Sequence, residues 1–251
     1  MKLMGKDAYD VHKTLSNYQF SAVGTDSLDG SEYTIVQIMV DGSCSVMGFK
    51  KKLEEAISRV LKSCRQSPRS ENLLLRVAEF GTQYKGNIKE LHGFTLISNL
   101  KDDQYKDALK PSGSTPLYDA ALSALESLEI FGGSLVDQDY LVNGIQFVIT
   151  DGFENSSRCR SADKIKDTVT RIRKEEKLET LQTILIGVDD THCRSELMQL
   201  KDDAGFDEYI SLGDVSSSKL AKLAQFVSQS ISTTSQSLGT GTAPTQIGFV
   251  A

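Results

Sequence analysis

The feature that most constrains this chain is the alternation of apolar, β-branched segments with amphipathic segments of helical periodicity. Residues 33–40 form a nearly continuous apolar run, which is typical of a strand buried on both faces. In residues 49–64 the apolar side chains instead recur at helical spacing. This exchange repeats along the chain, and strands that alternate with helices predict a parallel sheet covered on both faces.

The same patterns place the remaining elements. We expect further strands at 73–80, 88–97, 145–150, 181–188 and 208–211. We expect further helices at 102–109, from Pro116 to an end at Gly132-Gly133, and at 162–177, 195–204 and 217–231. The predicted class is α/β: a Rossmann-like, doubly wound, mostly parallel sheet with helices on both faces and the short strand 88–97 antiparallel at one edge.

The chain divides into one predicted domain and two flanking segments. Residues 31–231 form the domain, and residues 1–30 are an N-terminal extension. Within the extension Tyr18, Phe20 and Ala22 alternate, which indicates an added edge strand. Residues 232–251 are rich in Ser, Thr, Gly and Gln, which predicts a flexible tail.

Composition narrows the class of protein. With 39% apolar and 25% charged residues, the chain has the balance of a globular protein. Its net charge of −6 argues against nucleic acid as a partner. No apolar stretch approaches the ~20 residues of a membrane helix, so no membrane association is expected. Four scattered cysteines, with no Cys-x-x-Cys pair, predict reduced thiols in a cytoplasmic protein: Cys44, Cys64, Cys159 and Cys193.

Small polar residues gather where predicted strands end. Asp41, Ser43 and Ser45 follow the first strand, Asp151 follows the strand that ends at Thr150, and Thr115 stands at the start of a helix. In open α/β sheets, ligands bind beyond the carboxyl ends of the strands. The five side chains form an all-oxygen set of the kind that Mg²⁺ prefers, with Mn²⁺ and Ca²⁺ as alternatives. A competing interpretation is that the hydroxyls cap helices and that Asp151 belongs to a turn.

The order and spacing of Asp41-x-Ser43-x-Ser45, Thr115 and Asp151 resemble the metal-ion-dependent adhesion site of von Willebrand factor type A domains, of the bacterial intracellular type. The resemblance covers residues 33–231. It implies that the two serines, the threonine and the two aspartates contact the metal directly or through water. It also implies that a partner protein donates an Asp or Glu to the remaining coordination position.

One position departs from that pattern. Cys44 stands where the family has glycine, and Val46 precedes Met47. A positive φ at Cys44 would be strained, because only glycine adopts it freely. Apart from this loop conformation, we expect Cys44 to be a small buried filler.

The sequence offers little for catalysis. None of the histidines follows a predicted strand beside a nucleophile, and neither a Gly-x-Ser-x-Gly elbow nor a Walker loop is present. We therefore expect no enzyme, a hydrolase being the least favoured interpretation. The resemblance implies a Mg²⁺-dependent protein–protein interaction module in an intracellular signalling or stress-response system. The alternative is an adaptor or assembly subunit for an AAA-type ATPase or a metal-centre maturation system. The sequence specifies no oligomeric state.

Overall fold

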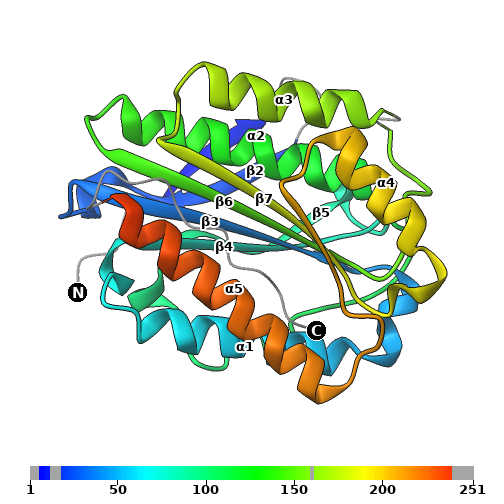
Figure 1. The fold of residues 1–251 in the computed structure, drawn as a ribbon. Coiled ribbons are helices and arrows are strands. Elements are labelled where there is room, and N and C mark those ends of the chain that lie inside the picture. The colour runs from blue at the N-terminus through cyan, green and yellow to red at the C-terminus, as the bar shows by residue number, and fades with distance from the viewer. Residues whose placement is uncertain (1–5, 12–17, 159–160, 239–251) are drawn as a thin grey trace.

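The computed structural model describes residues 6–11, 18–158 and 161–238. They form an eight-stranded sheet in the order β1-β2-β5-β4-β3-β6-β7-β8 (Figure 1). The strands are β1 (Lys6–Val11), β2 (Tyr18–Val23), β3 (Glu32–Asp41), β4 (Leu73–Phe80), β5 (Ile88–Leu96), β6 (Leu141–Thr150), β7 (Thr180–Gly187) and β8 (Glu208–Ser211). The α-helices are α1 (Lys50–Arg65), α2 (Leu117–Val136), α3 (Ala162–Lys174), α4 (Arg194–Ala204) and α5 (Ser217–Leu238).

The predicted fold class is confirmed. Strands β3, β4, β6, β7 and β8 pair in parallel, and β5 pairs antiparallel with β4 as expected. The sheet does not end at β5, because β2 pairs in parallel with β5 and β1 pairs antiparallel with β2. Antiparallel β5 is therefore an internal strand, and the extra strand indicated by Phe20 and Ala22 lies one position in from the edge.

The junction between β2 and β5 depends on a glycine. A Cβ atom at Gly93 would lie 1.9 Å from the carbonyl oxygen of Ser21, so no larger residue fits there without moving β2. Next to this close approach, the rings of Phe20 and Phe94 meet edge to face with centroids 5.9 Å apart. The glycine that interrupts the apolar pattern of β5 is thus the point at which the N-terminal strands join the sheet.

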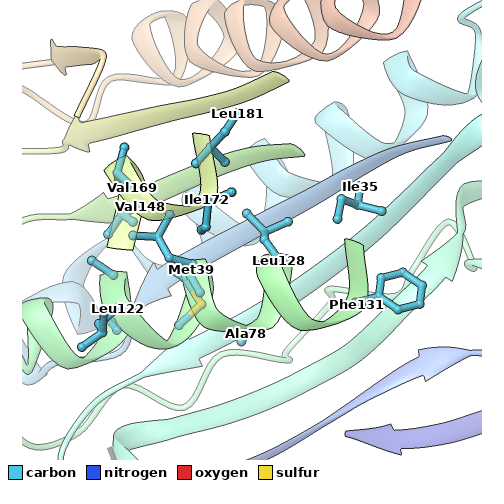
Figure 2. Close-up of a cluster of buried hydrophobic side chains, with 14 of the residues drawn as sticks. Ile35, Met39, Ala78, Leu122, Leu128, Phe131, Val148, Val169, Ile172 and Leu181 are labelled. Carbon is cyan, nitrogen blue, oxygen red and sulfur yellow. The ribbon is translucent and has the colours of Figure 1, made fainter. Parts of the chain in front are cut away.

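Helices cover both faces of the sheet. Helices α2, α3 and α4 pack on one face, and α1 and α5 pack on the other (Figure 1). Figure 2 shows Leu128 and Phe131 of α2, Ile35 and Met39 of β3 and Ile172 of α3 in one buried cluster. Because the central strands are buried on both faces, they read as continuous apolar runs in the sequence.

The predicted end of α2 at Gly132-Gly133 is wrong, since the helix continues to Val136. A Cβ atom at Gly132 would lie 2.4 Å from Cδ2 of Leu178 and 3.1 Å from Cδ1 of Ile35. Nothing lies within 4 Å of the corresponding position at Gly133. Gly132 therefore allows α2 to pack closely against its neighbours and does not terminate it.

Two other predicted boundaries change. Residues 102–109 form turns instead of a helix, because Asp107 has a φ of 56° and the carboxylate of Glu54 accepts the backbone N–H groups of Asp107 and Leu109. Helix α5 continues through residues 232–238, which were expected in the tail. Asn143 Nδ2 donates to the carbonyl of buried Thr234 over 2.8 Å and holds this last part of the helix on the sheet.

Three parts of the predictions fall outside the described residues: the tail beyond residue 238, Cys159, and residues 1–5 and 12–17 of the extension. Within the described ranges, no helix has both the length and the apolar character needed to span a membrane.

Candidate metal centre

The candidate site begins at the carboxyl ends of the two central strands. Strands β3 and β6 are direct neighbours, with Val40 paired to Ile149, so both end at the same edge of the sheet. Asp41 is the last residue of β3, and Asp151 follows directly after β6. The sheet register therefore brings together two carboxylates that are far apart in the sequence.

Hydrogen bonds join the loops that follow these strands. Ser45 Oγ donates to Asp151 Oδ1 over 2.9 Å, and the hydroxyls of Ser43 and Ser45 are 2.9 Å apart. Asp41 Oδ1 accepts the backbone N–H of Ser43 over 2.8 Å, and its Oδ2 accepts the hydroxyl of Thr150 over 2.6 Å. Four of the five predicted site residues thus form one hydrogen-bonded group.

Thr115, the fifth predicted residue, is brought to the same place by the loop after Asp151. A Cβ atom at Gly152 would lie 3.7 Å from Thr115 Oγ1. Asn155 fixes the Thr115 backbone from both sides: Asn155 Oδ1 accepts the Thr115 N–H over 2.9 Å, and the Asn155 N–H donates to the Thr115 carbonyl over 3.2 Å. The structure therefore brings all five predicted side chains to one edge of the sheet.

The first turn of α2 is capped by this loop and not by Thr115. The N-cap position is Pro116, which provides no side-chain cap. Glu154 Oε2 accepts the N–H of Tyr118 over 2.8 Å, and Ser157 Oγ accepts the N–H of Asp119 over 3.0 Å. Since the cap comes from residues after Asp151, the Thr115 hydroxyl is not used as the helix cap.

The loop before Thr115 is tied to the loop after Asp41. The carbonyl of Gly42 accepts the Ser112 N–H over 2.7 Å and Gln83 Nε2 over 2.9 Å. The carbonyl of Gly113 accepts the Cys44 N–H over 3.2 Å. Gly113 has a φ of +81°, a conformation that favours glycine. All three loops of the site are thus bonded to one another through their backbones.

The two carboxylates are withdrawn from water. Asp41 is fully buried and Asp151 is 4% exposed, and neither forms an ion pair with another described residue. Burial raises the pKa of Asp41 to about 7, and the nearby charge of Asp151 adds to the rise. Burial also raises the pKa of Asp151. A cation between these groups would relieve the cost of their ionisation.

The spacing of the oxygen atoms fits a small divalent ion. Mg²⁺ has Mg–O distances of ~2.0–2.1 Å, so adjacent corners of its octahedron are ~2.8–3.0 Å apart. The contacts from Ser43 Oγ to Ser45 Oγ and from Ser45 Oγ to Asp151 Oδ1 are both 2.9 Å. Ca²⁺, with Ca–O distances of ~2.3–2.6 Å, would require wider separations. Ser45 is exposed, so the group opens to solvent on one side.

The donor set is poor in strong metal ligands. No cluster of three or more His, Cys, Asp or Glu residues that could hold a metal occurs within the described ranges. An ion at this edge would therefore be held by two carboxylates, three hydroxyls and water. Such a set suits Mg²⁺, which usually retains several waters, and it does not suit a soft transition metal.

Cys44 differs from both expectations. It lies in a 3-10 turn, Cys44–Gly48, and is not among the described residues with positive φ, so the backbone strain expected from a positive φ is absent. It is exposed and therefore does not act as a buried filler. The turn places its side chain at the surface beside Ser45.

Some residues that build the site could not be identified from the sequence. Thr150 and Asn155 hold the predicted ligands Asp41 and Thr115, and Glu154 caps α2, yet each looks like an ordinary strand end or turn residue. Asp190 follows another aspartate in the sequence, yet it is fully buried and accepts hydrogen bonds from Ser211 Oγ and the Gly213 N–H, each over 2.9 Å. Polarity alone does not distinguish such structural carboxylates from solvated ones.

Comparisons with known proteins identify the fold and no family. No model of a protein family matches the chain, and no curated protein matches it. A solved structure of the PilB minor pilin from Streptococcus sanguinis is 16% identical with a TM-score of 0.57, over 88% of this chain and 66% of that one. The pilus adhesin SpaC from Lactobacillus rhamnosus GG, in an open conformation, is 10% identical with a TM-score of 0.57, over 92% of this chain and 34% of that one.

These findings correct the assignment to von Willebrand factor type A domains. No family model supports it, and the solved structures that match are pilus proteins of low sequence identity. The physical reason is that Asp41, Ser43, Ser45 and Asp151 satisfy one another by hydrogen bonds, so this short polar pattern has a structural explanation without common descent. The chain spans about two thirds of the pilin and one third of the adhesin. At these identities the likeness shows the α/β fold alone.

Proposed function

We propose that the chain binds Mg²⁺ at the carboxyl ends of β3 and β6 and uses the ion to recognise an acidic side chain of another protein. The ligands would be Asp41, Ser43, Ser45, Thr115 and Asp151, with Mn²⁺ as the closest substitute. The ion would supply positive charge at a fixed point, and the residues of the chain would hold and orient it.

One observation carries this proposal. Two buried carboxylates without an ion-pair partner among the described residues lie beside hydroxyl oxygens at the 2.9 Å spacing of octahedral Mg²⁺ ligands. Burying carboxylates is costly unless a cation balances them. The exposed position of Ser45 leaves one side of the group open to solvent, so a ligand from outside could complete the coordination.

The chemistry favours recognition over catalysis. In a site with two carboxylates, the ion would be nearly neutralised and would still attract one more anionic oxygen. None of the five proposed ligands is a histidine, lysine or cysteine that could act as a general base or nucleophile at the ion. A protein carboxylate is the ligand that such a site would hold.

We place this function in the cytoplasm, within a signalling or stress-response system. Three described cysteines, Cys44, Cys64 and Cys193, carry free thiols, which fit a reducing compartment. An adaptor or assembly subunit for an ATPase or a metal-centre maturation system would use the same site. Immunodetection in fractionated native cells tests the location, and detection at the cell surface would contradict it.

Calorimetry tests the metal. Titration of the whole chain with Mg²⁺ should give one site, and Asp151→Asn should abolish it while circular dichroism stays unchanged. Asp202→Asn is the matched control, because it removes an exposed carboxylate from α4. Equal Mg²⁺ binding by the wild type and Asp151→Asn, or no binding by either, would refute the proposal.

A further inference from the structure

The edge of the sheet that holds the candidate ion also carries unusual apolar exposure. Met47 is 61% exposed and Phe153 is 49% exposed. Among the described residues, the other large apolar side chains with comparable exposure are Leu141 and Met198. Single exposed apolar residues are common on protein surfaces, so the position of these two decides whether they have a role.

Both residues lie close in the sequence to the candidate ligands. Met47 is two residues after Ser45, and Phe153 is two residues after Asp151. A residue spans at most ~3.6 Å of chain, so each Cα lies within about 7 Å of the Cα of that ligand. Since Ser45 Oγ and Asp151 Oδ1 are 2.9 Å apart, the backbone at Met47 and at Phe153 lies near the same group of oxygens.

The backbone under both side chains is fixed. Met47 lies between Val46, which is fully buried, and Phe49, which is 7% exposed, so the turn is anchored on both sides. Phe153 precedes Glu154, whose carboxylate accepts the N–H groups of Tyr118 and Ser156 over 2.8 and 2.7 Å. Exposed apolar side chains on a preorganised backbone cost little ordering entropy when a partner covers them.

We propose that Met47 and Phe153 form an apolar rim around the candidate ion, and that the rim selects a protein segment in which an Asp or Glu lies beside large apolar side chains. This inference rests on the proposed Mg²⁺ site. A carboxylate that meets a cation in open water gains little, because solvent screens the pair. Apolar side chains that close over the contact exclude water and strengthen it, and Met and Phe are enriched in protein interfaces.

A library of random peptides displayed on phage, panned on the whole chain with Mg²⁺ and with chelator, tests the rim. We expect Mg²⁺-dependent enrichment of peptides with an acidic residue beside Leu, Ile, Met or Phe. The best peptide is then measured by fluorescence anisotropy. Met47→Ser and Phe153→Ser should each weaken the affinity for this peptide about tenfold, which corresponds to ~1.4 kcal/mol. Neither substitution should change Mg²⁺ affinity in calorimetry.

Leu141→Ser is the matched control, because Leu141 is 43% exposed and starts β6 at the opposite end of that strand. It should leave peptide affinity unchanged. The rim would be overturned, and the Mg²⁺ site left standing, by either of two results. One is enrichment of peptides with an acidic residue but no apolar preference, and the other is an equal loss of peptide affinity in all three variants. If the chain binds Mg²⁺ but enriches no Mg²⁺-dependent peptide, both the rim and the recognition function fail. If it binds no Mg²⁺, the site itself fails.

Discussion

Replacement of Asp41 by Asn removes one negative charge and keeps the shape of the side chain. The Asn oxygen can still accept the Ser43 N–H, which lies 2.8 Å from Asp41 Oδ1. The new NH₂ group faces Thr150 Oγ1, which bonds Asp41 Oδ2 over 2.6 Å. The Thr150 hydroxyl can then donate to the carbonyl of Gly152, 2.9 Å away, so the exchange leaves no buried group unsatisfied.

The size of the effect follows from the raised pKa of Asp41. In the folded chain it rises from 3.8 to about 7, and one pKa unit corresponds to ~1.4 kcal/mol. Because the folded pKa is the higher one, the native state binds the proton more tightly than the unfolded state. The stability linked to this group is complete below about pH 4 and is lost as the pH rises through 7. The stability lost through this group is then about 4 kcal/mol at pH 8 and less than half of that at pH 5, where the carboxyl ionises in the unfolded chain but stays protonated in the folded one.

Urea denaturation at the two pH values measures this cost. In chelator, Asp41→Asn should be more stable than the wild type by about 4 kcal/mol at pH 8 and by less than half of that at pH 5. With Mg²⁺ at ~100 times its Kd, the wild type should gain about 2.7 kcal/mol and the variant nothing. Stabilisation without metal and loss of response to metal are thus expected from one substitution.

Either of two results would contradict the expected effect of Asp41→Asn on stability. A variant that is no more stable than the wild type at pH 8 would show that Asp41 is not a strained buried charge. A gap that is the same at pH 5 and pH 8 would show that packing or hydrogen bonding, and not ionisation, causes it. Asp202→Asn, at an exposed position, should produce no gap at either pH.

Two further predictions follow from the contacts around the site and the core. Asn155→Ala removes the acceptor for the Thr115 N–H and should weaken Mg²⁺ binding about tenfold in calorimetry, whereas Asn155→Asp keeps the acceptor and should bind Mg²⁺ nearly as the wild type does. Equal losses of affinity in both variants would show that this hydrogen bond does not position Thr115. Gly132→Ala places a Cβ 2.4 Å from Leu178 and should destabilise the fold by about 1–3 kcal/mol, whereas Gly133→Ala meets nothing and should stabilise it by up to ~1 kcal/mol. Thermal unfolding of both variants measures these changes, and a neutral Gly132→Ala would contradict close packing of α2 against Leu178.

The sequence allowed the sheet to be predicted because its central strands are buried on both faces. Strand β4 was predicted with its observed bounds, Leu73–Phe80, since polar residues flank the apolar run on both sides. The grouping of Asp41 with Asp151 followed from the rule that parallel strands end at one edge. A strand or a site can be predicted from the sequence where its local pattern and a rule of sheet topology agree.

The remainder depends on contacts between distant residues. Gly132 looks like a helix terminator in isolation, and its role becomes clear only when Leu178 is seen against it. Asn155 and Asp190 lie in ordinary turn-like sequence; the partner of Asn155 is 40 residues away, and the partners of Asp190 are 19 or more residues away. The family assignment failed for a related reason: a few small polar residues at a suitable spacing describe a local arrangement of hydrogen bonds, which does not by itself identify a family.

The division of the candidate site between β3 and β6 has a consequence for how the chain folds. Asp41 and Asp151 lie more than a hundred residues apart and become neighbours only when β3 and β6 have paired in register, and such long-range pairing is slow to form. A nascent chain that has not yet reached β6 therefore has no complete set of oxygens for an ion. If the chain binds Mg²⁺ as proposed, the ion would bind only after β3 and β6 have paired, so it would slow unfolding and would not speed folding.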